Sequence, residues 1–121
     1  MVPSSQARSA YAAAPVRTAR DAEYTIFAAV TRALRAVDEA DYPKLSHAVA
    51  DNQRLWGALA DDLMSEGNAL PLQLRGNLIS LAEFVRKHTM AVLGGRGSVE
   101  PLIDINTMIM KGLRGGVEDA S

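Results

Sequence analysis

Residues 45–63 of the chain read LSHAVADNQRLWGALADDL, the clearest helical pattern in the sequence. Most of its large apolar residues are separated by three, four or seven positions, which places them on one face of an α-helix. Pro43 precedes the stretch and suits the first turn of a helix, so we expect a helix from Pro43 to about Glu66. Gly67 and Asn68 are expected to end it in left-handed conformations. The apolar face consists of Leu45, Val49, Leu55, Trp56, Leu59 and Leu63.

Three further segments on either side show the same helical spacing. We expect a first helix from about Thr18 to Ala40, where Thr18 and Asp21 resemble a capping pair. Its apolar face holds Ile26, Val30, Ala33 and Val37, widened by Phe27 and Leu34. After the connector at residues 67–71, a third helix with Leu74, Leu78, Leu81, Val85 and Val92 in register runs to Leu93 and ends at Gly94 and Gly95. With Ser98 as N-cap, a shorter fourth helix carries Leu102, Ile105, Ile109 and Leu113.

This organisation predicts an all-α protein, a compact bundle of about four helices with a flexible N-terminal leader. Residues 1–16, rich in Ala and Ser and interrupted by Pro3 and Pro15, are expected to form the leader. Residues 17–114 form the helical domain, and Gly115 and Gly116 open a flexible tail at 115–121. The 121 residues suffice for one domain with a hydrophobic core.

Composition narrows the class of function. The net charge of −1, with acids and bases interleaved, argues against direct nucleic-acid binding, which normally needs a basic excess. The absence of cysteine excludes disulfides, thiolate metal sites and a cysteine nucleophile. No apolar run reaches the ~20 residues of a membrane span, and the N-terminus lacks the apolar segment of a secretory signal. The expected location is the cytoplasm.

No constellation of residues indicates catalysis. His47 and His88 fall on different predicted helices, and the adjacent Asp61 and Asp62 point about 100° apart on a helix, so they do not converge. The glycine-rich loop at residues 94–97 is a weak phosphate signature that a connection between two helices explains equally well. We therefore expect no enzyme activity, metal, cofactor or small-molecule substrate.

Polar residues at the edges of the apolar faces are the candidates for protein binding. Asn52 lies one turn before Trp56, either hydrogen-bonded in the core or facing a binding groove. The pattern favours a core position for Trp56, although tryptophan also anchors interfaces. Asp104 and Asn106 interrupt an apolar segment, and Met108 and Met110 beside them suit either core filling or an adaptable peptide-binding surface.

Four stretches together resemble one family. They are residues 52–56 (NQRLW), 68–75 (NALPLQLR), 81–85 (LAEFV) and 102–106 (LIDIN), the last followed by Gly112 and Leu113. In this order, and with Tyr11 in an Ala-rich start, the chain resembles the FlaF family of flagellar biosynthesis regulators of alphaproteobacteria over residues 9–114.

The resemblance implies a cytoplasmic protein that binds flagellin, promotes its production and export, and opposes FlbT, a regulator of flagellin messenger translation. We expect the amphipathic terminal segments of flagellin to bind in a groove that includes part of the second and fourth helices. The candidate contact residues are Asn52, Arg54, Leu55, Trp56, Asp104, Asn106, Met110 and Leu113.

Two alternatives remain open. The chain is an adaptor that binds FlbT, or it binds flagellin messenger RNA. RNA binding would need a basic patch, for which Arg75, Arg86, Lys87 and Arg96 are the candidates.

Overall fold

The protein was analysed as a computed structural model that describes residues 15–119, with side chains described for residues 22–113. The described chain forms four α-helices: α2 (Pro15–Ala36), α3 (Tyr42–Leu63), α4 (Leu72–Leu93) and α5 (Glu100–Asp119). The predicted all-α bundle of four helices is confirmed. The predicted leader lies mostly outside the described residues, although Pro15 and Val16 already belong to α2.

The helix boundaries follow local chemistry. The Asp41 carboxylate accepts a hydrogen bond from the Lys44 backbone N–H, and Pro43 occupies the first turn of α3, as predicted. Helix α4 ends at Gly94, and Gly95 has a φ of 74°, a left-handed conformation that glycine adopts without steric cost. In front of α5, the Ser98 hydroxyl accepts a hydrogen bond from the Glu100 backbone N–H.

Three predicted helix ends were wrong. Helix α2 ends at Ala36, four residues before the predicted Ala40, and the Ala40 backbone N–H donates to the Asp38 carboxylate instead of continuing the helix. Helix α3 ends at Leu63 with Met64 in a right-handed helical conformation, and neither Gly67 nor Asn68 has a positive φ. Helix α5 continues through Gly115 and Gly116 to Asp119, beyond the predicted end. A glycine inside a helix costs only about 1 kcal/mol relative to alanine, so the glycine pair does not by itself stop a helix.

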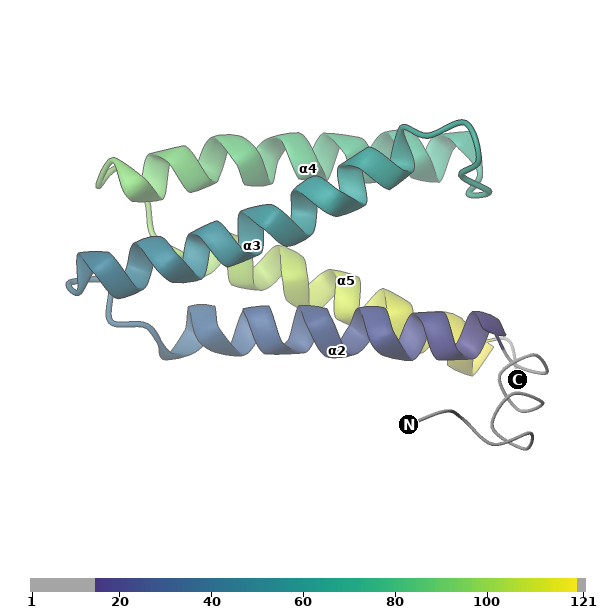
Figure 1. The fold of residues 1–121 in the computed structure, drawn as a ribbon, viewed down its shortest axis with the longest axis horizontal. Helices are drawn as coiled ribbons and strands as arrows, with labels where there is room; N and C mark the ends of the chain where they lie inside the picture. The colour runs from purple at the N-terminus through teal and green to yellow at the C-terminus, as the bar shows by residue number, and fades with distance from the viewer. Residues whose placement is uncertain (1–14, 120–121) are drawn as a thin grey trace, which may run out of the picture.

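The helices are arranged as two pairs joined through α3 (Figure 1). Helix α3 packs on both α4 and α2, and α5 packs mainly on α2, whereas α4 and α5 make few contacts with each other. At one end, the Tyr42 hydroxyl donates to the Leu93 carbonyl and ties α3 to α4. The Arg35 guanidinium donates to the Thr107 hydroxyl and ties α2 to α5. Within the described residues, no helix combines the length and the apolar character that a membrane span needs.

The core is formed by one face of each helix. Phe27 and Trp56 meet edge to face, with ring centroids 5.8 Å apart, where α2 crosses α3. On α2 the buried face is therefore Phe27, Thr31 and Leu34, whereas Ile26, predicted to face the core, is 50% exposed. The large rings and Leu34 set the rotation of α2, and Ile26 turns outward as a consequence. The buried apolar side chains are Phe27, Leu34, Leu45, Ala48, Val49, Trp56, Leu63, Ala82, Val85, Val92, Val99, Leu102 and Ile103.

Candidate functional site

A buried polar cluster lies at the centre of the bundle and joins α3 to α5. The Trp56 indole Nε1 donates to Asn106 Oδ1 at 2.9 Å, and Asn106 Nδ2 donates to Asn52 Oδ1 at 2.7 Å. All three side chains are at most 1% exposed. Because Asn52 and Trp56 are one turn apart on α3, both face the same point on α5. Asn52, Trp56 and Asn106 are referred to below as the Asn–Trp–Asn cluster.

The sequence left open whether Asn52 and Trp56 lie in the core or at a binding surface, and both are buried in the core. The Asn–Trp–Asn cluster is core structure, and none of its side chains reaches the surface in this conformation. Buried amides and indoles need hydrogen-bond partners. These three side chains bond to one another across two helices, and only the Asn52 Nδ2 among their polar atoms has no partner in the described part of the chain. The polar interruption of α5 at Asn106 thus has an internal explanation. A direct contact of these three side chains with a partner would require the helices to separate.

The other predicted contact residues are spread over the surface. Arg54 is exposed and paired with Asp51 on its own helix. Asp104 is exposed, and Leu55 and Met110 are half-buried at the edge of the core. Leu113 lines an open groove described next. The structure therefore does not gather the predicted residues into one site, and their role in binding stays a prediction.

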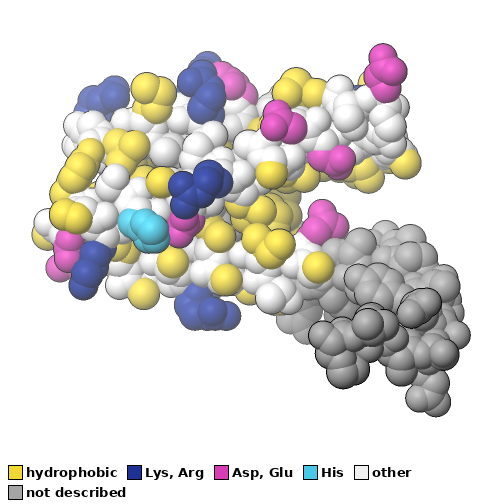
Figure 2. Space-filling view, viewed as in Figure 1, with side chains coloured by type: hydrophobic (Ala, Val, Ile, Leu, Met, Phe, Trp, Pro, Cys, Tyr) yellow, Lys and Arg dark blue, Asp and Glu magenta, His cyan; other side chains and the backbone are white. Residues whose placement is uncertain are grey.

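An open apolar concavity lies where α4 and α5 diverge. It has a volume of about 380 Å³, which is within the range of about 300–1,000 Å³ common for binding pockets. Figure 2 shows a hollow between the far end of the α3–α4 pair and the α2–α5 pair, with hydrophobic side chains at its base. We call it the apolar groove. It is lined by Glu23, Phe27, Leu59, Leu70, Leu74, Leu78, Met108, Ile109, Gly112 and Leu113.

The two walls of the apolar groove follow from sequence spacing. Leu74 and Leu78 are one turn apart on α4 and share one side of that helix. Leu70, in the connector before α4, lines the groove beside them. Met108 and Gly112 repeat the same spacing on α5. Leu70, Leu74 and Met108 are 39%, 42% and 52% exposed, although large apolar side chains normally seek the core. They remain exposed because no helix of the described chain fills the space between α4 and α5.

The connector before α4 is held by specific hydrogen bonds. The Asn68 amide donates to the Asp62 carboxylate at 3.1 Å, and its own oxygen accepts from the Leu70 backbone N–H. The Arg75 guanidinium donates to the Leu63 carbonyl at 3.0 Å, which satisfies an acceptor at the end of α3. These bonds fix Leu70 on the groove wall. Asn68, Leu70 and Arg75 belong to the stretch 68–75 on which the family resemblance rests.

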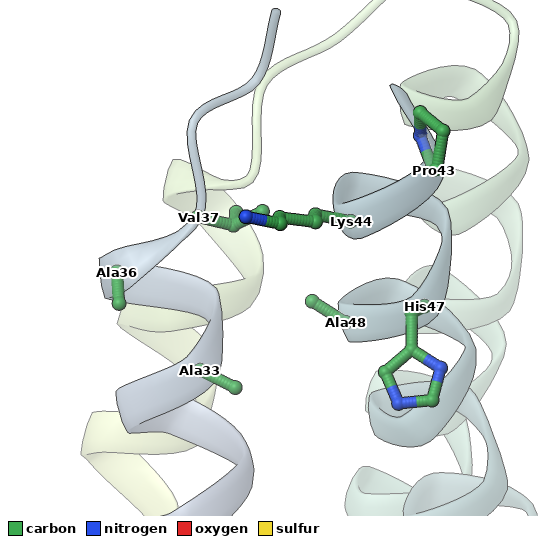
Figure 3. A pocket seen from close by; sticks show the side chains of 7 residues that line it. All are labelled: Ala33, Ala36, Val37, Pro43, Lys44, His47 and Ala48. Carbon is green, nitrogen blue, oxygen red and sulfur yellow. The ribbon is translucent and has the colours of Figure 1, made fainter. Parts of the chain in front are cut away.

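Two other hollows are formed by described residues. One of about 230 Å³ adjoins the apolar groove, shares Glu23, Phe27 and Leu59 with it, and also contains Leu55. The other, of about 400 Å³, lies between the end of α2 and the start of α3 (Figure 3). Ala33, Ala36 and Ala48 form much of it, and its edge groups Lys44 and His47 approach Asp41 and Asp51 within 4 Å.

The sequence analysis did not identify several of the residues that line the apolar groove. Leu74 and Leu78 were predicted as core positions of the third helix, and Leu70 and Gly112 were not proposed as contacts. The available signal was the four-residue spacing of three leucines that begins before the helix. Among the side chains that the structure describes, no group of three His, Asp or Glu residues is placed to hold a metal ion.

The fold and the site together define a small helical-bundle protein with an open apolar groove beside a hydrogen-bonded polar core. The family model of the flagellar protein FlaF matches residues 6–113, nearly the whole sequence. The chain therefore belongs to the FlaF family, as the sequence resemblance indicated. No curated protein and no solved structure matched the chain.

Proposed function

We propose that this protein binds flagellin in the cytoplasm as an export chaperone and so promotes flagellin synthesis and secretion, in opposition to FlbT. The observation that carries the proposal is the apolar groove in a member of a flagellar family. An exposed concavity with leucine on one wall and methionine, isoleucine and leucine on the other suits an apolar helix face.

The physical argument concerns the terminal segments of flagellin, which are amphipathic and become helical in the filament. Before assembly, their apolar stripe is exposed and favours premature association. A segment seated between Leu74 on α4 and Met108 on α5 would remove its stripe from water, and burial of apolar surface gains about 25 cal/mol per Å². Methionine adapts its shape at low cost, which suits a groove that receives related sequences.

The experiment is calorimetric titration of the full chain with monomeric flagellin at two salt concentrations. We expect saturable, salt-tolerant binding with a negative heat-capacity change, the mark of apolar burial. Gly112→Leu tests the location, because a Cβ added at Gly112 meets no atom within 4 Å and the larger side chain enters the groove. Gly76→Leu is the matched control, since Gly76 is an equally open glycine on α4 outside the groove lining.

Gly112→Leu should weaken flagellin binding at least about tenfold, a loss of about 1.4 kcal/mol, while Gly76→Leu leaves it unchanged. Both variants should keep or raise thermal stability, because leucine favours a helix more than glycine does. Equal affinities for the two variants would contradict binding in the apolar groove.

No binding of flagellin to the wild-type chain would contradict the chaperone function itself. The alternative is then an adaptor for FlbT or for flagellin messenger RNA, and the same titration is repeated with those partners. If the partner is RNA, several cations of the predicted basic patch are already paired within the protein. Arg86 and Lys87 pair with Glu83, and Arg75 bonds to the Leu63 carbonyl.

A further inference from the structure

The apolar groove carries acidic groups at its edge, and this charge defines the chemistry of its occupant. We propose that the groove selects an amphipathic helix whose apolar stripe is flanked by Lys or Arg, with Glu23 and Asp62 as the selecting residues. The identity of the natural partner as flagellin rests on the function proposed above. The charge preference itself rests on the residues of the groove.

Glu23 lies where the two adjoining hollows meet. It lines both the apolar groove and the smaller hollow beside it, next to Phe27 and Leu59 in each. Its side chain is exposed, so the carboxylate is accessible to a partner. A helix laid over Phe27 and Leu59 would therefore have Glu23 beside its apolar stripe.

Asp62 lines the smaller hollow on the opposite side, which is formed by α3. One carboxylate oxygen accepts a hydrogen bond from Asn68, which holds the group in place at the end of the connector. The residue is exposed, and a hydrogen bond from a neutral amide leaves its negative charge uncompensated. Within residues 22–113, neither Glu23 nor Asp62 forms an ion pair of 4 Å or less.

No described Lys or Arg side chain offsets these two charges in the lining of either hollow. In Figure 2, acidic side chains lie on both sides of the hollow, whereas most of the visible Lys and Arg side chains lie over the other half of the molecule. Several of those cations have acidic partners of their own, as Arg54 has Asp51 and Arg86 has Glu83. Among the side chains of residues 22–113, those charged and lining the groove or the smaller hollow are thus acidic.

Charge at the edge of an apolar site governs selection more than total affinity. Rim charges change the association rate and its salt dependence, and like charges brought together disfavour the wrong partner. Exposed ion pairs contribute up to about 1 kcal/mol each, which corresponds to a few-fold in affinity per charge. Two acidic groups are therefore expected to give a preference of about tenfold for a cationic helix over an acidic one.

The test uses two synthetic 18-residue peptides with the same leucine stripe, one flanked by lysine and the other by glutamate. Binding of each labelled peptide to the full chain is followed by fluorescence anisotropy at about 50 mM and about 500 mM salt. We expect the lysine-flanked peptide to bind about tenfold more tightly at low salt, and the preference to shrink at high salt by screening.

The variant Glu23→Gln/Asp62→Asn removes both charges and keeps an acceptor for Asn68. It should reduce the preference to within about twofold. Asp61→Asn is the matched control, because Asp61 is an exposed acid next to Asp62 that lines neither hollow. This control should retain the full preference. Circular dichroism verifies that each variant is folded.

Equal binding of the two peptides to the wild-type chain, binding of neither, or an equal effect of Asp61→Asn and the double variant would overturn the proposal. These outcomes are separable from the flagellin titration. Flagellin binding without a charge preference leaves the proposed function intact. A charge preference without flagellin binding supports the selecting groove and assigns it to another cationic helix.

Discussion

The Trp56 indole N–H donates a 2.9 Å hydrogen bond to the side-chain oxygen of Asn106, fifty positions away in the sequence and buried in the same core. The Asn106 amide group in turn donates a hydrogen bond to the side-chain oxygen of Asn52. A polar chain of this kind fixes the rotation of α5 against α3, because turning either helix would leave buried donors without acceptors.

Asn106→Ala is expected to destabilise the protein by about 2–4 kcal/mol, since it leaves the Trp56 N–H and the Asn52 oxygen buried without their partner. Urea unfolding followed by Trp56 fluorescence measures the change. Asp104→Ala, at an exposed position on the same helix, is the control and should change stability by less than about 0.5 kcal/mol. Equal effects of the two substitutions would mean that the cluster is not a determinant of stability. From sequence alone, Asn106 was a candidate contact residue for flagellin, whereas the structure buries it in the core.

Thr31→Val is expected to leave stability unchanged or to raise it by up to about 1 kcal/mol. The Thr31 side chain is 0% exposed, and its hydroxyl has no hydrogen-bond partner in the described part of the chain. Valine has nearly the same shape and removes a buried polar group that is not compensated. Thermal unfolding measures the difference, with Thr89→Val as control, because the Thr89 hydroxyl donates to the Val85 carbonyl. A clear loss of stability in Thr31→Val would show that its hydroxyl is hydrogen-bonded, for example to a buried water molecule.

Gly95→Ala should cost about 1–2 kcal/mol, because the φ of 74° at this position places an L side chain against the backbone. Gly67→Ala provides the comparison: Gly67 has no positive φ, and an added Cβ meets nothing within 4 Å. It is expected to be neutral or slightly stabilising. Chemical denaturation of both variants gives the two free energies of unfolding. Similar values would argue against a left-handed Gly95 in solution.

Arg86 lowers the pKa of the Glu83 carboxyl through a hydrogen bond and through its positive charge, and Lys87 adds to the effect. Because the folded-state pKa is depressed, the pair stabilises the fold above the unfolded-state pKa, and this contribution is lost as the pH falls through the folded-state pKa. Arg86→Gln should raise the pKa of Glu83 towards its ordinary value, as measured by NMR titration of the side-chain carboxyl. The pair is exposed and solvent-screened, so the stability of the variant should hardly change. An unchanged pKa would show that the ion pair does not persist in solution.

Much of the fold was predictable because its signals are local. Apolar spacing located all four helices, and Pro43, Pro71 and the pair Gly94 and Gly95 marked ends that the structure confirms. The ends of α2, α3 and α5 were predicted less well. Glycine weakens a helix without forbidding it, so packing and neighbouring turns decide whether a helix continues past it.

Spacing and residue patterns along the chain were enough to specify the all-α class, the location of the four described helices and membership of the FlaF family. Which polar residues are internal and which leucines are exposed became clear from the packing of the helices. Asn106 is buried because Trp56 and Asn52 come to it from another helix, and Leu74 remains exposed because α5 diverges from α4. Both outcomes depend on the relative placement of distant segments, which the periodicity of a single helix does not encode.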